Sequence, residues 1–126
     1  MKFLIIIPTH NEEENILLTL NSLKSQGFQD FTCVIVNDGS TDRTREMVEG
    51  FVDKKQFQLI NLEKSAHSPG AKVVSTFYKG LSSQNLDDFD VICKFDADII
   101  FPENYLEEIN RIYEENPKAG MVSGLV

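Results

Sequence analysis

The pattern best suited to chemistry is Asp96-Ala97-Asp98, which puts two carboxylates one residue apart directly after an apolar run at residues 91–95. Carboxylate oxygens are the hard ligands that magnesium and manganese prefer in proteins. An Asp-x-Asp pair also arises by chance in an acidic chain, so the pair alone does not establish a metal site. Its position directly behind a predicted strand is what makes it informative.

Two further polar clusters follow apolar runs in the same way. Pro8-Thr9-His10-Asn11 comes after the run at residues 3–7, and Asn37-Asp38-Gly39-Ser40 comes after the run at residues 31–36. Ligands of an open parallel sheet bind outside the carboxyl ends of its strands. We therefore expect both clusters and the two aspartates to share one edge of a sheet.

The carboxylates of Asp38, Asp96 and Asp98 would then lie near one another. Like charges at close range repel unless a cation lies between them, which favours a bound divalent ion at this edge. A purely structural interpretation of the second cluster stays open, because Asp38 and Gly39 suit a turn and Ser40 suits a helix cap.

The overall charge excludes some classes of ligand. The 126 residues contain 20 Asp and Glu against 12 Lys and Arg, which gives a formal net charge of −8. This balance argues against binding to nucleic acid and against a polybasic membrane-surface segment, since both need positive charge. A phosphate-containing ligand becomes compatible with such a chain if helix N-termini or a bound cation make the local field positive.

The rest of the sequence alternates buried strands with amphipathic helices, at a length that suits one domain over residues 1–126. Such alternation predicts parallel β-α units joined by right-handed crossovers. Because the last apolar run has no polar tail, we expect the sequence to be the first part of a longer protein. We expect strands at residues 3–7, 31–36, 57–62, 91–95 and 121–126, and helices at residues 12–25, 43–52, 71–81 and 102–115.

Local signals refine these elements. Asn11, with Glu14 three residues later, has the form of an N-cap and capping box, which predicts that the first helix begins at Glu12. Cys33 and Cys93 lie in strand runs without the spacing of a zinc site, so we expect buried thiols and a reducing compartment. The helix residues expected to face the core are Ile16, Leu17, Leu20, Leu23, Met47, Val48, Phe51, Val74, Phe77, Tyr78, Leu81, Leu106, Ile109, Ile112 and Tyr113.

Three stretches resemble family 2 glycosyltransferases of the GT-A fold, in the order and at the spacing of that family. They are Ile5 to Glu13, Val34 to Asp42, and Lys94 to Asp98 followed by Pro102 and Leu106. The resemblance covers essentially the whole chain. It implies a Rossmann-like α/β sheet that binds a nucleotide-diphosphate sugar, with helices on both faces.

The resemblance also implies roles for individual residues. Asp38 would hydrogen-bond a uracil or guanine base, Asp98 would ligate magnesium or manganese at the diphosphate, and Asp96 would touch the ribose or the metal. Lys72 is a weaker match, because the residues after it depart from the family pattern, and Asn37 replaces a common Asp, which leaves the base open. The implied nucleotide-binding residues are Pro8, Thr9, His10, Asn11, Asp38, Lys72 and Asp96, and the implied metal ligands are Asp98 and Asp96.

The implied reaction is inverting transfer of a sugar from UDP or GDP to an unknown sugar or lipid-linked acceptor, in synthesis of a cell-surface polysaccharide or glycan. The resemblance puts the general base on a carboxylate beyond Val126, so the acceptor half is expected to be absent and this chain to transfer no sugar. We expect a cytoplasmic location, at the inner face of the membrane where the acceptor requires it. An apolar terminal strand would also favour a homodimer.

Other classes of protein fit less well, although one stays open. A receiver-like magnesium-binding signalling domain needs acidic residues directly after the first strand, where this chain has Pro8-Thr9-His10-Asn11. A dinucleotide oxidoreductase needs a Gly-x-Gly-x-x-Gly turn there, and a nucleotidyltransferase usually has a Gly-rich basic loop. A non-catalytic nucleotide-binding module on the same fold is compatible with the sequence.

Overall fold

The computed structural model describes the backbone of residues 1–62, 69–115 and 122–123, and the side chains of residues 1–62 and 75–115. Five parallel strands form one sheet in the order β3-β2-β1-β4-β5. The strands are β1 (Phe3–Thr9), β2 (Phe31–Asp38), β3 (Phe57–Leu62), β4 (Val91–Lys94) and β5 (Val122–Ser123). The helices are α1 (Ile16–Lys24), α2 (Thr44–Phe51), α3 (Pro69–Ser82), the 3-10 turn η1 (Leu86–Asp88) and α4 (Tyr105–Glu115).

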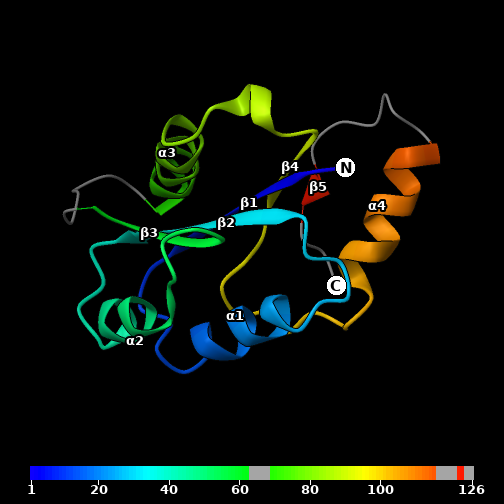
Figure 1. The fold of residues 1–126 in the computed structure, drawn as a ribbon. Helices are drawn as coiled ribbons and strands as arrows, with labels where there is room; N and C mark the ends of the chain where they lie inside the picture. The colour runs from blue at the N-terminus through cyan, green and yellow to red at the C-terminus, as the bar shows by residue number, and fades with distance from the viewer. Residues whose placement is uncertain (63–68, 116–121, 124–126) are drawn as a thin grey trace.

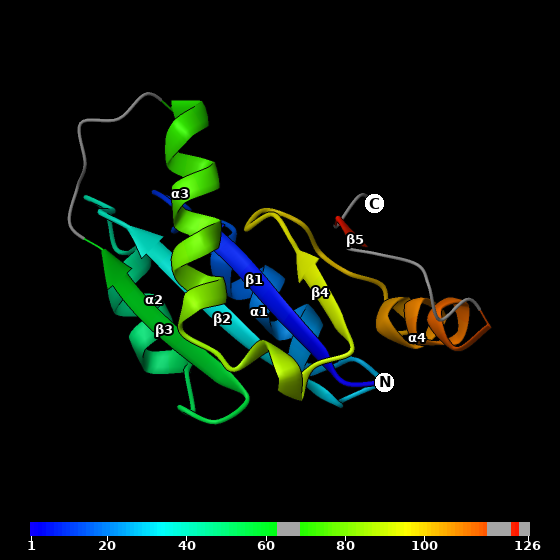
Figure 2. The same ribbon diagram turned by 90° about the horizontal axis from the view of Figure 1, so that it is seen from above.

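The helices cover both faces of the sheet, as predicted. Helix α3 lies on one face, and α1 and α2 lie on the other (Figure 1). Strand β1 is the central strand, with β2 on one side and β4 on the other, and all three run in the same direction (Figure 2). A strand in this position is buried from every side, which explains why its sequence is a continuous apolar run instead of an alternating one.

Successive residues of β1 belong to two separate cores, because side chains of a strand alternate between the faces of a sheet. Phe3, Ile5 and Ile7 pack with buried residues of α1, α2 and α4. Leu4 and Ile6 pack with β2 and with Phe77 of α3. The sheet is therefore held on both sides, and this fixes where its strands end.

Helix α3 approaches the sheet closely at Gly80. A methyl group added to this glycine would lie 2.7 Å from Cγ2 of Ile6 and 3.1 Å from Cγ2 of Val36. Both neighbours are fully buried strand residues with no room to shift. The glycine thus sets the distance between α3 and the sheet.

The predicted start of the first helix is wrong. Helix α1 begins at Ile16, four residues after Glu12, and Asn11 is not its N-cap. Asn11 has a positive φ of 51°, which is outside the helical region. The segment before α1 bonds instead to the loop after β2, since the backbone N–H of Glu12 donates to Oγ1 of Thr44 over 2.9 Å.

Other expectations needed smaller corrections. Helix α4 begins at Tyr105, so Pro102 precedes its first turn. Tyr78 and Ile112 are 62% and 49% exposed, although both were expected to face the core. They lie at the border of the apolar stripe of their helices, where 3.6-residue periodicity does not decide burial. Val74 and the predicted final strand lie outside the residues whose side chains are described.

The two thiols are buried in the core as predicted. Burial raises the pKa of the Cys33 thiol far above its ordinary value and that of Cys93 to about 12. Both cysteines are therefore neutral packing residues with little nucleophilic character at neutral pH.

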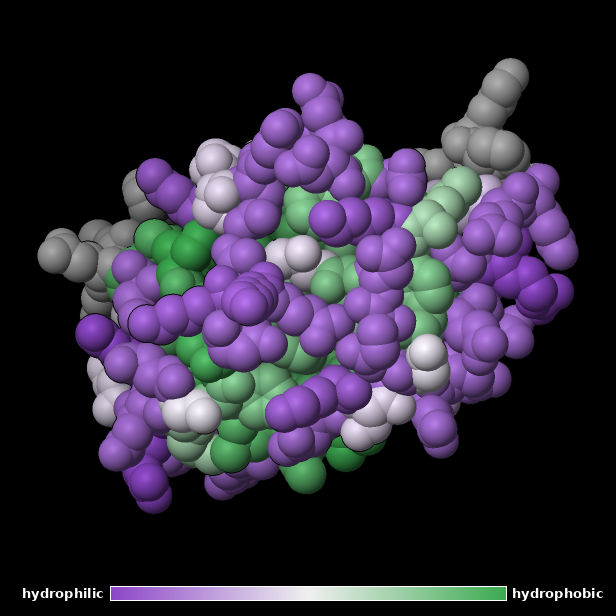
Figure 3. All heavy atoms as spheres, in the orientation of Figure 1, coloured by the Kyte–Doolittle hydropathy of each residue, from purple (hydrophilic) through white to green (hydrophobic). Residues whose placement is uncertain are grey.

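The contact between α1 and α2 leaves apolar side chains half-exposed. Leu17, Met47 and Phe51 were expected to face the core, and they line a groove of about 380 Å³ between the two helices. Figure 3 shows apolar surface among polar side chains on this part of the molecule. In the residues that the structure describes, no helix is long and apolar enough to cross a membrane.

Candidate functional site

Three loops that carry the predicted site residues leave the sheet at the same edge, the carboxyl edge. Thr9 at the end of β1 is aligned with Asn37 of β2. On the other side of β1, Ile6 is aligned with Lys94 of β4, and the backbone N–H of Phe95 donates to the carbonyl of Ile6 over 3.0 Å. The register therefore brings residues 8–11, residue 38 and residues 96–98 to one edge, as the sequence predicts.

The loops after β1 and β2 are bonded directly to each other. Ring nitrogen Nδ1 of His10 lies 2.6 Å from the backbone carbonyl oxygen of Asp38. The backbone N–H of Asn11 donates to Oγ of Ser40 over 3.0 Å, and Oδ1 of Asn11 accepts from the backbone N–H of Thr41 over 2.8 Å. These bonds explain the strained backbone of Asn11, because its side chain takes the place of a backbone partner for the second loop.

The buried side-chain amide of Asn37 bonds to the loop after β2 and stabilises the contact between the two loops. Asn37 is almost fully buried, and its Nδ2 donates to Oδ1 of Asn61 over 3.0 Å. Its Oδ1 accepts from the hydroxyl of Ser40, the same hydroxyl that receives the Asn11 N–H. Asn61 was missed in the sequence, although it aligns with Asn37 in the register of β3 with β2.

Asp38 is well placed to meet a ligand. It is 7% exposed, and among the residues whose side chains are described it has no hydrogen-bond or ion-pair partner for its carboxylate. Gly39 follows with a positive φ of 58°, and its N–H donates to the carbonyl of Leu62 over 3.1 Å. The positive φ of Gly39 is a conformation for which glycine is favoured, so the chain can turn directly after Asp38.

Asp96 and Asp98 are both exposed, whereas Ala97 between them is buried. Nζ of Lys94 lies 3.7 Å from Oδ1 of Asp96. The carbonyl oxygen of Ala97 accepts from Oγ1 of Thr19, on α1, over 2.9 Å. The two carboxylates are thus exposed to solvent, while the backbone between them is bonded to a buried residue of α1.

The donor set at these aspartates fits magnesium or manganese. Across the described residues, no group of three or more His, Cys, Asp or Glu side chains could hold a metal by itself. Magnesium commonly uses only one or two protein carboxylates and completes its octahedron with water and substrate phosphates. A pair of exposed carboxylates is therefore suited to an ion that is shared with a diphosphate, and unsuited to a structural metal.

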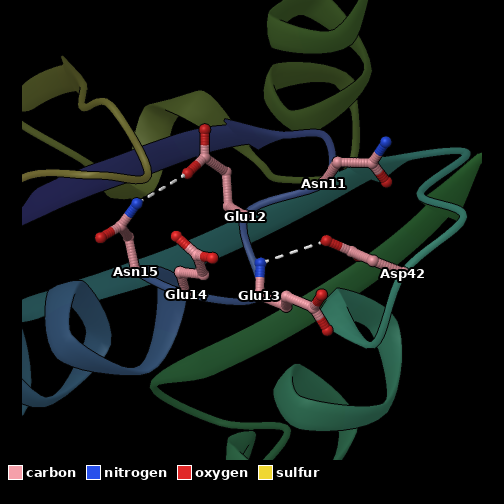
Figure 4. A pocket seen from close by; sticks show the side chains of 6 residues that line it. All are labelled: Asn11, Glu12, Glu13, Glu14, Asn15 and Asp42. Atoms are coloured by element: carbon pink, nitrogen blue, oxygen red, sulfur yellow. Dashed lines mark hydrogen bonds between the residues drawn. The ribbon is translucent and has the colours of Figure 1, made fainter.

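A second hollow, of about 140 Å³, lies beside the loop after β1 and is acidic (Figure 4). The backbone N–H of Glu13 donates to Oδ2 of Asp42 over 3.3 Å. Burial favours a higher pKa for the Asp42 carboxyl, but hydrogen bonds from Thr44 and Glu13 outweigh it and lower the pKa. The residues that line this hollow are Asn11, Glu12, Glu13, Glu14, Asn15 and Asp42. This concentration of negative charge makes it unsuitable for a phosphate group.

Lys72 was the remaining predicted site residue. Its backbone lies in the first part of α3, and its side chain is outside the described residues. Its expected place near the base or diphosphate is therefore neither supported nor opposed by the geometry.

Comparison with known proteins gives consistent results. The protein is 42% identical to the poly(ribitol-phosphate) beta-N-acetylglucosaminyltransferase TarS of Staphylococcus aureus over 72 residues, 56% of this chain and 13% of the relative. It is 30% identical over 126 residues to a dolichyl N-acetyl-alpha-D-glucosaminyl phosphate 3-beta-D-2,3-diacetamido-2,3-dideoxy-beta-D-glucuronosyltransferase of Methanococcus voltae, covering 97% of this chain and 38% of the relative.

Solved structures agree with these relatives. The crystal structure of S. aureus TarS 1-349 in complex with UDP-GlcNAc matches with a TM-score of 0.77 and 29% identity, over 93% of this chain and 32% of that one. The fold is therefore the GT-A fold predicted from the sequence. The chain spans well under half the length of the relatives it matches.

The family model described as Glycosyl transferase family 2 matches residues 4–126, nearly the whole chain. This match excludes the receiver-like signalling domain that was the main alternative. It also agrees with the three stretches on which the resemblance was based, all of which lie within the matched residues. The chain belongs to glycosyl transferase family 2.

Proposed function

We propose that this chain binds a nucleotide-diphosphate sugar, UDP- or GDP-linked, through magnesium or manganese, as the donor-binding part of an inverting glycosyltransferase. The observation that carries the proposal is the convergence of three loops at the carboxyl edge. One loop has the nearly buried Asp38, whose carboxylate has no partner among the residues whose side chains are described, and another has the exposed Asp96 and Asp98. The similar TarS structure is a complex with UDP-GlcNAc, which supports a uridine nucleotide here.

The nucleoside would be held by the first two loops. Pro8 and Thr9 end β1, and His10 and Asn11 follow it in the loop. The bond from His10 to the Asp38 carbonyl keeps the two loops at a fixed distance. The Asp38 carboxylate can then accept hydrogen bonds from N–H groups of a uracil or guanine ring. A carboxylate that is nearly buried binds such donors more strongly than an exposed one, because less water competes.

The diphosphate would be held at Asp96 and Asp98. A divalent cation there neutralises negative charge that develops on the leaving diphosphate during sugar transfer. The two aspartates supply hard oxygen ligands, and Lys94 holds Asp96 from the sheet side. Lys72 would add positive charge near the same groups. This arrangement explains how a chain of net charge −8 can bind an anion.

The proposal for residues 1–126 does not include the acceptor site or the general base. The acceptor would be a sugar or a lipid-linked sugar, and the pathway would be synthesis of a cell-surface polysaccharide or glycan. Asp38, Asp96 and Asp98 are already assigned to the base and the metal. A base must face the acceptor, opposite the leaving group, and the family resemblance places it beyond Val126.

Isothermal titration calorimetry tests the donor proposal directly. UDP, GDP and ADP would each be titrated into the chain, once with excess manganese and once with EDTA. We expect UDP or GDP to bind about 10-fold or more tightly in manganese than in EDTA, because without the ion the exposed carboxylate pair repels the diphosphate. ADP should bind more weakly than UDP or GDP in manganese, since Asp38 is assigned to a uracil or guanine ring. Equal UDP and GDP affinity with and without the metal contradicts the metal-bridged site.

A further inference from the structure

One face of α1 is devoted to holding the backbone that follows β4. Thr19 and Ser22 are three residues apart and lie on the same side of α1, and Gln26 follows just beyond the end of the helix. Oγ1 of Thr19 donates to the carbonyl of Ala97 over 2.9 Å, and Oγ of Ser22 accepts from the N–H of Phe101 over 3.0 Å. Gln26 bonds to the segment further along. These contacts join residues 76 to 80 positions apart in the sequence.

Thr19 is the residue of this group that bonds to the backbone between the two aspartates. Thr19 is fully buried, and the carbonyl it binds belongs to the residue between Asp96 and Asp98. Ala97 is itself buried in the core, and its carbonyl is held by the Thr19 hydroxyl of α1. The exposed aspartates on either side receive their direction from this one held residue, because the orientation of a peptide unit sets where its neighbouring side chains project.

Magnesium demands near-ideal octahedral geometry at about 2.0–2.1 Å from each oxygen. A pair of solvent-exposed carboxylates meets this demand only if the backbone beneath it is rigid. Partners outside the ligand set that orient metal ligands typically change metal affinity by about 10–100-fold when they are removed. The Thr19 hydroxyl is such a partner, because it holds the backbone between the two proposed metal ligands.

We infer that Thr19 is a positioning residue for the divalent cation, acting through the Ala97 carbonyl without touching the ligand. The inference rests on the proposed metal-bridged binding of a nucleotide diphosphate at Asp96 and Asp98. It adds a residue of the first helix, outside the three stretches that carry the family resemblance, to the determinants of metal affinity.

A hydroxyl in a buried helix could instead serve stability alone, and Gln26 provides the matched control. Gln26 is also buried and bonds to the carbonyls of Ser22 and Pro102 and to the N–H of Leu106, at 3.1, 2.5 and 2.9 Å. These bonds hold the approach to α4, past the acidic pair. Loss of Gln26 should lower stability without loosening Ala97.

The test compares Thr19→Val, Thr19→Ser and Gln26→Leu with the wild-type chain. Val keeps the shape of Thr but loses the donor, whereas Ser keeps the donor. For each protein, UDP affinity is measured by calorimetry in manganese and in EDTA, and the thermal midpoint is measured by circular dichroism. We expect T19V to lose about 10-fold in manganese-dependent UDP affinity, near the low end for an orienting partner, with unchanged affinity in EDTA. T19S should stay within about 2-fold of wild type in manganese.

The stability control separates the two roles. Q26L should lower the thermal midpoint by at least as much as T19V and keep the manganese-dependent affinity, and the comparison of T19V with T19S stands even where Q26L does not fold. The inference is overturned if T19V binds UDP in manganese as tightly as wild type, or if T19S loses as much affinity as T19V. A wild-type chain that shows no manganese dependence contradicts the proposed function itself, which distinguishes the two failures.

Discussion

The ring of His10 donates a hydrogen bond from Nδ1 to the backbone carbonyl of Asp38 over 2.6 Å, across 28 residues of sequence. A carbonyl oxygen only accepts, so Nδ1 carries the hydrogen, and Nε2 of the neutral ring is left as an acceptor. The bond involves the backbone of Asp38 and leaves its carboxylate free. The loops after β1 and β2 therefore stay joined when the Asp38 side chain is changed.

This relationship makes Asp38→Ala a clean test of base recognition. Removing a hydrogen bond to a charged group costs about 1.5–3 kcal/mol, so we expect UDP affinity in manganese to fall by about 10-fold or more. Pyrophosphate, which has no base, should bind with unchanged affinity. Calorimetry with both ligands measures the difference. If UDP and pyrophosphate weaken together, Asp38 acts on the metal or on the loop structure instead of the base.

The metal-binding prediction compares two exposed aspartates. Asp98→Ala should abolish the manganese-dependent part of UDP binding, because it removes one of two protein carboxylates from the proposed site. Asp88→Ala removes the same charge from η1, which lies on the opposite side of the sheet from α1 (Figure 1). Asp88→Ala should therefore bind UDP as wild type does. Similar losses in both variants would indicate a general charge effect.

Gly80→Ala should destabilise the fold by about 1–3 kcal/mol, the usual cost of forcing a methyl group into a packed interior. The added Cβ would lie 2.7 Å from Ile6 Cγ2. Gly50→Ala is the matched control, since it lies in α2 with nothing within 4 Å of an added Cβ. That change should stabilise by about 0.5–1 kcal/mol, as alanine does in a helix. Urea denaturation followed by circular dichroism measures both.

Acid should weaken the fold partly through Asp53. Hydrogen bonds from the N–H groups of Phe57 and Lys55 lower the pKa of its carboxyl below the ordinary value. A depressed pKa in the folded state gives stability that is complete above the ordinary carboxylate pKa, near pH 4, and is lost as pH falls through the folded pKa. Asp53→Asn should therefore be less stable than wild type at neutral pH, and the gap should close as the pH falls through the lowered pKa of Asp53 in the folded state. A gap that is constant with pH would show that the charge of Asp53 is unimportant.

The chain is expected to bind the donor without transferring its sugar. Incubation with labelled UDP-sugars, manganese and a panel of sugar acceptors should give no glycosylated acceptor and, at most, slow release of free sugar to water. The physical reason is that proton removal from the acceptor needs a base opposite the leaving group, and the carboxylates assigned here face the donor. Robust transfer to any acceptor would place the general base within residues 1–126.

Much of the fold could be predicted because burial leaves a local trace. A strand covered on both faces must be apolar throughout, and residues 3–7 therefore identified β1 without any knowledge of its neighbours. The first four predicted strands then agree with the observed ones within about two residues at each end, the usual uncertainty of element boundaries. The position of Asp38, Asp96 and Asp98 at one edge follows from the same alternation of strands and helices.

Long-range hydrogen bonds leave no such trace, and this is where the sequence failed. Asn11 and Glu14 have the form of a capping box, yet the Asn11 side chain bonds to Thr41, which approaches only when β1 and β2 pair. Thr19 appears as an ordinary polar residue of an amphipathic helix, and only the packing of α1 beside β4 gives its hydroxyl a carbonyl to bind. The sequence by itself determined which residues are apolar, which are charged, and in what order strands and helices follow. The tertiary structure alone decided which polar groups meet, because a hydrogen bond depends on a few ångströms between atoms that the chain separates by tens of residues.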